Sequence, residues 1–593
     1  MREPGTTRTA EKKGGRAARP VAADADNVTR KALAMAANLT GGLSPQAFAG
    51  AWFTVLGRLA VSPGRQAQLA RQLLQKSLAM AQFAGSSFKG RAPEAEGTPY
   101  ANRFSGPEWS KFPFNLLAQS FLTVSGVARD AVKDVPGMDP GAAGRVGFTL
   151  REGLEVLAPD NYLPTNPKLI EQTVQEQGRN LLRGVKHLAQ DVTRTFKGEG
   201  PPGVEQFRVG EHVAVSPGKV ILRNRLMELI QYAPQTDKVH AEPVLIVPAW
   251  IMKYYILDLS PKNSLVNYLT GLGHTVFMIS WKNPAAEDRE LAMDDYLTLG
   301  VLAALDAVNA VVPKRKVHAT GYCIGGTLLA IAAAALAARD DDQLASVTMF
   351  AAQTDFSEPG ELAVFISPSQ LAMLEAQMWK QGVLDSRQMG SAFQLLRSYD
   401  LLWSPSVTAY LKGERTGLND LMAWNADGTR MAWRMHTDYL RQLYLENQLA
   451  EGRYVALGEE LDLADITVPM FVVGTETDHV APWRSVYKVG KLVRSSDYTF
   501  CLTSGGHNAG IISGPEHPKR RHRVRTTRSG GRLLGADKFM ERVEPAQGSW
   551  WPVWAEWLRS HSATRKVPPP AMGSPRRGYT PAGDAPGSYV LQK

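Results

Sequence analysis

Residues 321–326 read Gly-Tyr-Cys-Ile-Gly-Gly, and this stretch decides the fold. Residues 317–320, just before it, form a short run typical of a buried strand, and residues 327–338 are rich in Ala and Leu, which favours a helix. The chain must therefore reverse sharply around Cys323. The glycines that lie two residues before and two residues after this cysteine lack the Cβ atoms that would collide in so tight a turn. The stretch predicts a strand-to-helix elbow with a cysteine at its tip.

The cysteine of this elbow is a candidate nucleophile. The pattern is the G-x-S-x-G elbow with Cys in place of Ser, and the positive end of the following helix favours the thiolate, which is the form that attacks. A free cysteine is also often a small buried hydrophobic residue. The motif alone leaves both roles open for Cys323.

Two later segments favour the catalytic role. Residues 470–474 have the apolar pattern of a strand and lead into a polar loop with Asp478, and residues 498–503 predict a strand that leads into Gly-Gly-His507. Nucleophile, acid and histidine in this order, with the last two on loops after strands, is the arrangement of α/β-hydrolases. We therefore predict a catalytic triad of Cys323, Asp478 and His507.

The same fold supplies two backbone donors to a reaction oxyanion. One is the N–H of the residue after the nucleophile, here Ile324, and the other comes from the loop after an earlier strand. Residues 244–247 predict that strand, and Pro-Ala-Trp follows at 248–250. Ala249 is the candidate for the second donor.

The three active-site segments also carry a family resemblance. Residues 321–326, the stretch Gly-Thr-Glu-Thr-Asp-His-Val-Ala-Pro-Trp at 474–483 and Gly-Gly-His at 505–507 resemble polyhydroxyalkanoate synthases of class I, the bacterial polymerases of storage polyesters. The resemblance extends from about Pro99 to the C-terminus. Two departures stand out: the Ala-Trp pair at 249–250, and the Arg-rich residues 519–532 that follow the histidine segment.

The resemblance implies an activity and a set of partners. The expected reaction joins (R)-3-hydroxyacyl-CoA units into a growing polyester chain and releases CoA, through an acyl group carried on Cys323. Asp478 would help to deprotonate the chain hydroxyl or only orient His507. The resemblance further implies a homodimer bound to a polymer granule. The CoA thioester is itself the substrate, so we expect no cofactor and no metal.

Two other classes of function share parts of this pattern. A cysteine hydrolase, either a polyester depolymerase or an acyl-CoA thioesterase, would have the same elbow and triad and differ only in its acyl acceptor. A non-catalytic granule-associated protein would need no triad, so the triad counts against it.

Composition excludes several further classes. The chain has 593 residues and two cysteines, Cys323 and Cys501, so a disulfide framework is not expected, and a reduced cytoplasm suits the reactive thiol. No apolar run reaches the roughly 20 residues that span a bilayer. The formal net charge of +10 resides mainly in residues 1–31, 519–532 and 565–577. We interpret these as solvated tails or loops and predict no nucleic-acid partner.

The resulting fold class is an α/β-hydrolase fold with a helical cap insertion, preceded by a mostly helical N-terminal domain. The amphipathic helices expected within residues 28–83 could pack their apolar faces on the catalytic domain, on a second subunit or on the polymer, and burial in a core is the default expectation. A final helix around Trp550–Trp557 is expected to show an exposed or interfacial aromatic side. The predicted units are a disordered basic tail (1–27), the N-terminal domain (28–203) and the catalytic domain (204–593), which contains the cap (355–465), a basic insertion (514–532) and an extended C-terminal tail (564–593).

Overall fold

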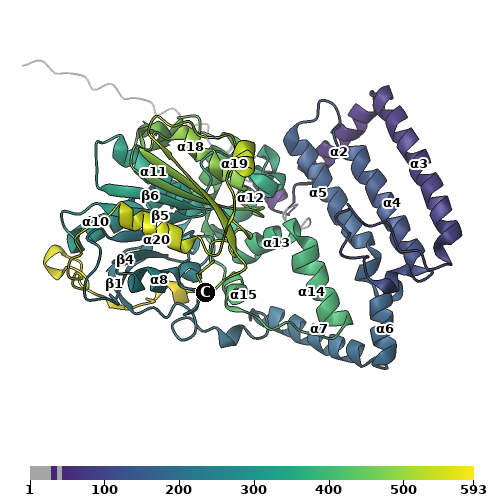
Figure 1. The fold of residues 1–593 in the computed structure, drawn as a ribbon, viewed down its shortest axis with the longest axis horizontal. Coiled ribbons are helices and arrows are strands. Elements are labelled where there is room, and N and C mark those ends of the chain that lie inside the picture. The colour runs from purple at the N-terminus through teal and green to yellow at the C-terminus, as the bar shows by residue number, and fades with distance from the viewer. Residues whose placement is uncertain (1–28, 36–42) are drawn as a thin grey trace, which may run out of the picture.

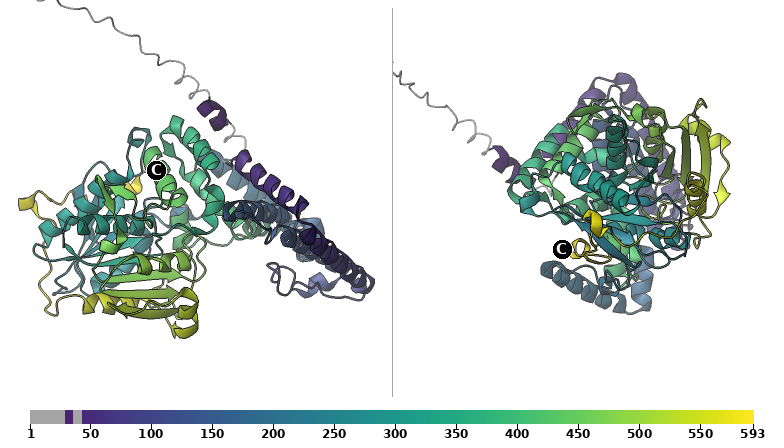
Figure 2. Two further views of the ribbon diagram at one scale, coloured as in Figure 1. Left: turned by 90° about the horizontal axis from the view of Figure 1, so that it is seen from above. Right: turned by 90° about the vertical axis from the view of Figure 1, so that its left-hand side faces the viewer.

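The structure is a computed structural model that describes residues 29–35 and 43–593 (Figure 1). The predicted tail at 1–27 lies outside the described residues. A helical N-terminal part occupies one end of the molecule and a large sheet with its helices the other (Figure 1). Seen from above in Figure 2, the N-terminal helices extend away from the sheet.

The N-terminal part is built from helices, most of which begin at a proline. The elements are α2 (Pro45–Ala60), α3 (Pro63–Ser87), α4 (Phe114–Val132), α5 (Pro140–Leu157), α6 (Pro167–Gln175) and α7 (Arg179–Lys197). Ser44, Asp139 and Asn166 accept hydrogen bonds from first-turn N–H groups of α2, α5 and α6, which is the usual way to satisfy these donors. The sequence predicts one helix over 168–190, but the chain breaks it before Gly178, which has a left-handed φ of 78°.

The apolar faces of these helices are only partly covered. Phe48 and Val55 of α2 are buried, as expected for a core. Phe53, however, is 74% exposed, and Leu73 and Leu74 of α3 are exposed as well. The expectation that these faces pack into a core is therefore wrong for much of α2 and α3, because the four-helix arrangement covers only one side of each helix.

The catalytic part is organised around one sheet of 11 strands in the order β14-β13-β12-β11-β6-β5-β3-β4-β2-β1-β15. Its central strands β4, β3, β5, β6, β11 and β12 run parallel, and the remaining strands join antiparallel at both sides. The strands are β1 (Gly218–Arg223), β2 (Met227–Tyr232), β3 (Val244–Val247), β4 (Val276–Trp281), β5 (Val317–Tyr322), β6 (Leu344–Phe350), β11 (Met470–Thr475), β12 (Asp497–Thr503), β13 (Arg521–Arg528), β14 (Ala546–Gln547) and β15 (Gly583–Asp584). Every strand predicted from the sequence is present.

Helices cover both faces of this sheet. α10 (Ala303–Val311), α11 (Ile324–Ala337) and α17 (Trp483–Tyr487) pack in the larger apolar core, and α8 (Leu265–Gly271) and α20 (Trp551–Ser560) pack in the core of the opposite face. The expectation of an exposed aromatic side on the last helix is wrong. Trp550, Trp551, Trp554 and Trp557 are all buried, and the indole N–H of Trp554 donates to Thr348 Oγ1 at 3.1 Å.

A helical segment is inserted between β6 and β11. It contains α12 (Pro368–Gln381), α13 (Ser386–Leu396), α14 (Ser404–Ser406), α15 (Asp420–Asn425) and α16 (Trp433–Asp438), with the short strand pairs β7 (Val383–Leu384) with β8 (Met431–Ala432) and β9 (Tyr454–Ala456) with β10 (Glu459–Leu461). Figure 1 shows that α13 and α14 lie between the sheet and the N-terminal helices. Asp191 of α7 accepts a hydrogen bond from Tyr410 at 3.0 Å, so this segment joins the two parts.

The Arg-rich segment after the predicted histidine is ordered. Residues 521–528 form β13, which pairs with β12 along its whole length, Thr503 opposite His522 and Asp497 opposite Arg528. The expectation of a solvated loop is wrong for these residues. The only apolar residue of the strand, Val524, is half-buried, and Arg521, Arg525 and Arg528 are exposed.

Candidate active site

Cys323 lies at the elbow between β5 and α11, with φ 54° and ψ −129°. Its N–H donates to Phe350 O at 2.8 Å, which fixes the turn to the neighbouring strand β6. A Cβ atom on Gly321 would lie 2.4 Å from Gly326 Cα, and one on Gly325 would lie 2.3 Å from Val247 O. The elbow therefore requires glycine at both positions, for the steric reason given by the sequence.

The predicted acid and base lie on the loops after β11 and β12 and are in contact. His507 Nδ1 and Asp478 Oδ2 are 2.8 Å apart. Asp478 Oδ2 also accepts from Thr475 Oγ1 at 2.9 Å, and Oδ1 accepts from the N–H groups of Val480 and Ala481 at 2.9 and 2.8 Å. The Asp478 side chain is 0% exposed, so its four hydrogen bonds hold it in one orientation.

The charges of the site depend on each other. Burial by itself would lower the pKa of His507, but the interactions with the Asp478 carboxylate and with Cys323 outweigh it and raise that pKa well above its usual value. Burial by itself would raise the pKa of Asp478, but His507 and the hydrogen bonds from Ala481 and Thr475 hold it below its usual value. The arrangement stabilises a protonated imidazole between a carboxylate and a sulfur.

The candidate oxyanion donors lie on two segments that meet at the elbow. Ile324 is the first residue of α11, so its N–H has no acceptor within the helix. Pro248 O lies 2.5 Å from the position of a Cβ on Gly325, which brings the loop after β3 against the elbow and places Ala249 beside it. Both candidates named from the sequence are thus at the elbow.

Further residues at the site were not identified from the sequence. Tyr439 and Tyr444 come from the inserted helical segment, and both interact electrostatically with Cys323. Burial raises the pKa of both phenols, so they stay neutral near the sulfur. Tyr322 donates to Asn508 Oδ1 at 2.6 Å and so braces the loop of His507. Of these residues, only Asn508 could have been found from the sequence, because it directly follows His507.

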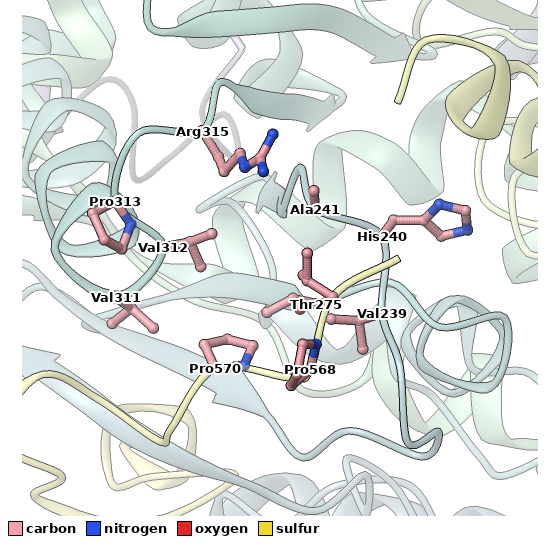
Figure 3. A pocket seen from close by; sticks show the side chains of 11 residues that line it. Val239, His240, Ala241, Thr275, Val311, Val312, Pro313, Arg315, Pro568 and Pro570 are labelled. Atoms are coloured by element: carbon pink, nitrogen blue, oxygen red, sulfur yellow. The ribbon is translucent and has the colours of Figure 1, made fainter. Parts of the chain in front are cut away.

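A separate cavity lies at the opposite end of the sheet (Figure 3). It measures about 220 Å³ and is lined by residues that include His240, Thr275 and Arg315. Thr275 precedes β4 directly, whereas the triad follows the carboxyl ends of its strands. This cavity is therefore no part of the triad site.

In residues 29–35 and 43–593, no group of three or more His, Cys, Asp or Glu side chains is arranged to hold a metal ion. None of the helices in the same residues is long and apolar enough to cross a membrane.

Comparisons with known proteins give two family matches. Residues 100–269 match the family described as poly-beta-hydroxybutyrate polymerase N-terminus, and residues 242–512 match the α/β-hydrolase fold family. The second match confirms the predicted fold class.

Curated relatives cover most of the chain. A poly(3-hydroxyalkanoate) polymerase of Methylorubrum extorquens is 40% identical over 511 residues, which is 84% of this chain and 82% of the relative. The poly(3-hydroxyalkanoate) polymerase subunit of Rhizobium meliloti is 37% identical over 82% of this chain and 79% of its own. That of Cupriavidus necator is 34% identical over 84% of each chain.

Proposed function

The chain belongs to the family of poly(3-hydroxyalkanoate) polymerases, and from this membership we propose that Cys323 is the nucleophile that carries the acyl group. The protein is an acyltransferase that polymerises hydroxyacyl-CoA thioesters into polyester and releases CoA. One observation carries the assignment of Cys323. Cys323 lies on the strained elbow and interacts electrostatically with His507, whose Nδ1 lies 2.8 Å from Oδ2 of the buried Asp478.

The first step of the proposed mechanism is acylation. His507 accepts the proton of the Cys323 thiol, and the thiolate attacks the thioester carbonyl of an (R)-3-hydroxyacyl-CoA. The negative charge that develops on the carbonyl oxygen is met by the N–H groups of Ile324 and Ala249. The carbonyl then re-forms, the bond to the CoA sulfur breaks, and His507 returns its proton to the leaving thiolate. One thioester replaces another, so the step is nearly balanced in energy.

The second step is elongation. The hydroxyl of another hydroxyacyl unit loses its proton to His507 and attacks the acyl group on Cys323, which forms an ester and frees the thiolate. Both carboxylate oxygens of Asp478 are already engaged by His507, Thr475 and two backbone N–H groups. The geometry therefore supports a role of Asp478 through His507 over direct contact with the hydroxyl.

The test of this proposal is a comparison of purified variants with (R)-3-hydroxybutyryl-CoA. Cys323→Ala is expected to release no CoA and to form no insoluble polyester, and Cys323→Ser to be only weakly active, because a serine hydroxyl is far from ionised near neutral pH. Cys501→Ala is the matched control, since this second cysteine is buried inside β12. Activity in Cys323→Ala would refute the nucleophile assignment. CoA release without polymer in the unmodified protein would indicate a thioesterase.

The proposal extends to the partners. We place the protein in the cytoplasm, where its thiol stays reduced, as a homodimer at the surface of a polyester granule. Exposed apolar side chains support a granule contact: on α7, Leu182 is 73% and Phe196 is 89% exposed. Monomeric soluble proteins rarely expose large contiguous apolar patches.

A further inference from the structure

The loop after β3 is held by two segments that are distant in the sequence. Thr429 of the inserted helical segment donates to Trp250 O at 2.6 Å, and the indole N–H of Trp424 donates to Lys253 O at 2.8 Å. From the other end of the chain, Gln592 O accepts a hydrogen bond from Lys253 Nζ at 2.6 Å. Lys253 thus contacts the inserted segment through its carbonyl and the C-terminal segment through its ammonium.

Lys253 is an unusual position for a charge. The residue is 3% exposed, and in the described part of the chain no carboxylate lies within ion-pair distance of its Nζ. Burial lowers the pKa of its ammonium to about 8, although the more distant Asp427 opposes this. A buried cation with one neutral acceptor is costly, and an apolar side chain of the same length would avoid this cost. The presence of a lysine at this position is therefore not explained by a contribution to the stability of the fold.

The C-terminal segment that Lys253 reaches is itself firmly held. The carboxylate of Glu228, which is fully buried in β2, accepts hydrogen bonds from the N–H groups of Ser588 and Tyr589, both at 2.9 Å. Gln592 Oε1 accepts a hydrogen bond at 3.0 Å from the N–H of Asn283, two residues after the end of β4. Figure 1 shows the end of the chain beside α15, in agreement with these contacts. Residues 588–593 are thus tied to the sheet itself.

The loop that Lys253 joins to this segment is the one that carries Ala249. Pro248 lies against the elbow glycine Gly325, so a small shift of the loop moves the Ala249 N–H relative to the sulfur. Donors to a developing oxyanion must be positioned within a few tenths of an ångström, and misplacing a group by about 1 Å costs about 100-fold in rate.

We propose that Lys253 is a positioning residue for the polymerase reaction: through Gln592 it ties the loop of Ala249 to the sheet-bound segment 588–593 and so keeps the oxyanion donor in place. The proposal rests on the oxyanion role of Ala249 in the proposed function. In this proposal Lys253 does not touch the substrate and acts only by positioning the loop. It also gives a function to the C-terminal segment, which the reaction itself does not use.

The first test is Lys253→Met in the full-length protein. Met keeps the length and packing of the side chain and removes the ammonium, so the melting temperature is expected to stay the same or rise. The single-turnover rate of Cys323 acylation is expected to fall roughly 10- to 100-fold, as for a displaced oxyanion donor, while KM stays near its original value. A matched control is Lys219→Met, which removes an exposed ion pair to Asp584 in the same tail and is expected to leave the rate unchanged.

The second test is a double-variant cycle with a protein that ends at Leu591 and so lacks the acceptor. If Lys253 acts through Gln592, this variant shows the same loss, and combining it with Lys253→Met adds no further loss. An unchanged acylation rate in Lys253→Met, or multiplied losses in the combined variant, would overturn the proposal. If Lys253→Met melts far below the unmodified protein, the acylation rate of the variant that ends at Leu591 is the deciding measurement. An unchanged rate in that variant would overturn the proposal. Activity in Cys323→Ala would refute the proposed function itself, and because it is measured on a different variant, that failure is distinguishable from a failure of this inference.

Discussion

At the residue scale, the two cysteines differ in backbone conformation: that of Cys323 is strained, and that of Cys501 is not. A non-glycine residue in such a conformation costs about 1–3 kcal/mol, and the surrounding structure must enforce it. Here the enforcement is visible in the bond from Cys323 N to Phe350 O and in the glycines on either side. Cys501, in the middle of β12, has an ordinary strand position, and burial raises the pKa of its thiol above the usual range.

His507 and Asp478 are expected to differ in how strongly acylation and elongation depend on them. His507→Gln should prevent acylation and elongation, because it removes the base for both. Asp478→Asn should still allow a single acylation, since a thiol needs little help to ionise, but should slow elongation strongly, since an alcohol is much less acidic. Rapid-quench measurement of CoA release, set against steady-state polymerisation, separates the steps. Equal losses of both steps in Asp478→Asn would contradict this division.

The raised pKa of His507 also predicts how stability varies with pH. A folded-state pKa above the unfolded value of about 6.5 stabilises the protein fully below that value, and this stabilisation is lost as the pH rises through the folded pKa. The unmodified protein should therefore lose stability relative to His507→Gln as the pH is raised above about 6.5. Urea unfolding of both proteins between acidic and alkaline pH measures this. A stability difference that is constant or grows with pH would be inconsistent with the charged pair.

The positions of the three candidate triad residues could be predicted because they carry local signals: glycines around Cys323, and apolar strands directly before the loops of Asp478 and His507. Tyr439 and Tyr444 could not. They interact electrostatically with Cys323 from the inserted segment, whose placement depends on packing that no short sequence pattern encodes.

At the element scale, β13 is the largest departure from the sequence-based expectation. Only Val524 in it is apolar, so the strand has no alternating apolar face to identify it, and its order comes from backbone pairing with β12. β14 covers only Arg521 and His522, which leaves the rest of the outer edge of β13 without a strand partner in the described structure. Charged side chains on such an edge hinder pairing with another molecule.

This role of the arginines leads to a prediction. Arg525→Thr with Arg528→Thr should keep polymerase activity but increase aggregation, because the exposed edge loses its charge while gaining strand-forming residues. Light scattering against time at constant concentration measures the effect. Arg576→Thr with Arg577→Thr removes the same charge from a short 3-10 helix away from the strand edge and serves as the control. Equal aggregation of the two double variants would show that net charge, and not the strand edge, is responsible.

The aromatic helix α20 shows a different limit of sequence reasoning. A run with four tryptophans within eight residues predicted an apolar side but not what would cover it. In the structure the sheet face and the loop of Ile511 cover it, and the indole N–H groups of Trp550 and Trp551 donate to Gly510 O and Ile511 O. α20 therefore supports the loop that follows His507.

At the scale of the whole molecule, the N-terminal part differs most from a self-contained domain. On α7, Asn180, Gly184 and His187 face the inserted segment, with His187 Nδ1 3.0 Å from Ala409 O. The side turned away from that contact is a row of exposed apolar residues, namely Leu182, Val185, Leu188, Val192 and Phe196. Helical periodicity predicted amphipathic helices correctly. Which apolar faces become buried depends on how the helices pack together, and the periodicity of a single helix does not give this information.

If this row contacts the polyester, making it polar should affect where the enzyme resides and not its chemistry. Leu182→Gln with Val185→Gln and Phe196→Gln is expected to reduce the share of enzyme that sediments with the polymer, while the rate of CoA release from the first turnovers is unchanged. Lys186→Gln with Gln190→Ser, on another side of the same helix, is the control. Undiminished sedimentation of the apolar-row variant would exclude α7 as the contact.

The central claim, that Cys323 carries the acyl group, is tested most directly by trapping that intermediate. (R)-3-hydroxybutyryl-CoA is mixed with the protein, the reaction is quenched in acid within the first turnover, and the digested protein is examined by mass spectrometry. The peptide that contains Cys323 should carry one or more hydroxybutyryl groups in amounts that match the CoA released, and the same peptide from Cys323→Ala should carry none. CoA release with an unmodified Cys323 peptide, or acylation of another residue, would contradict the account.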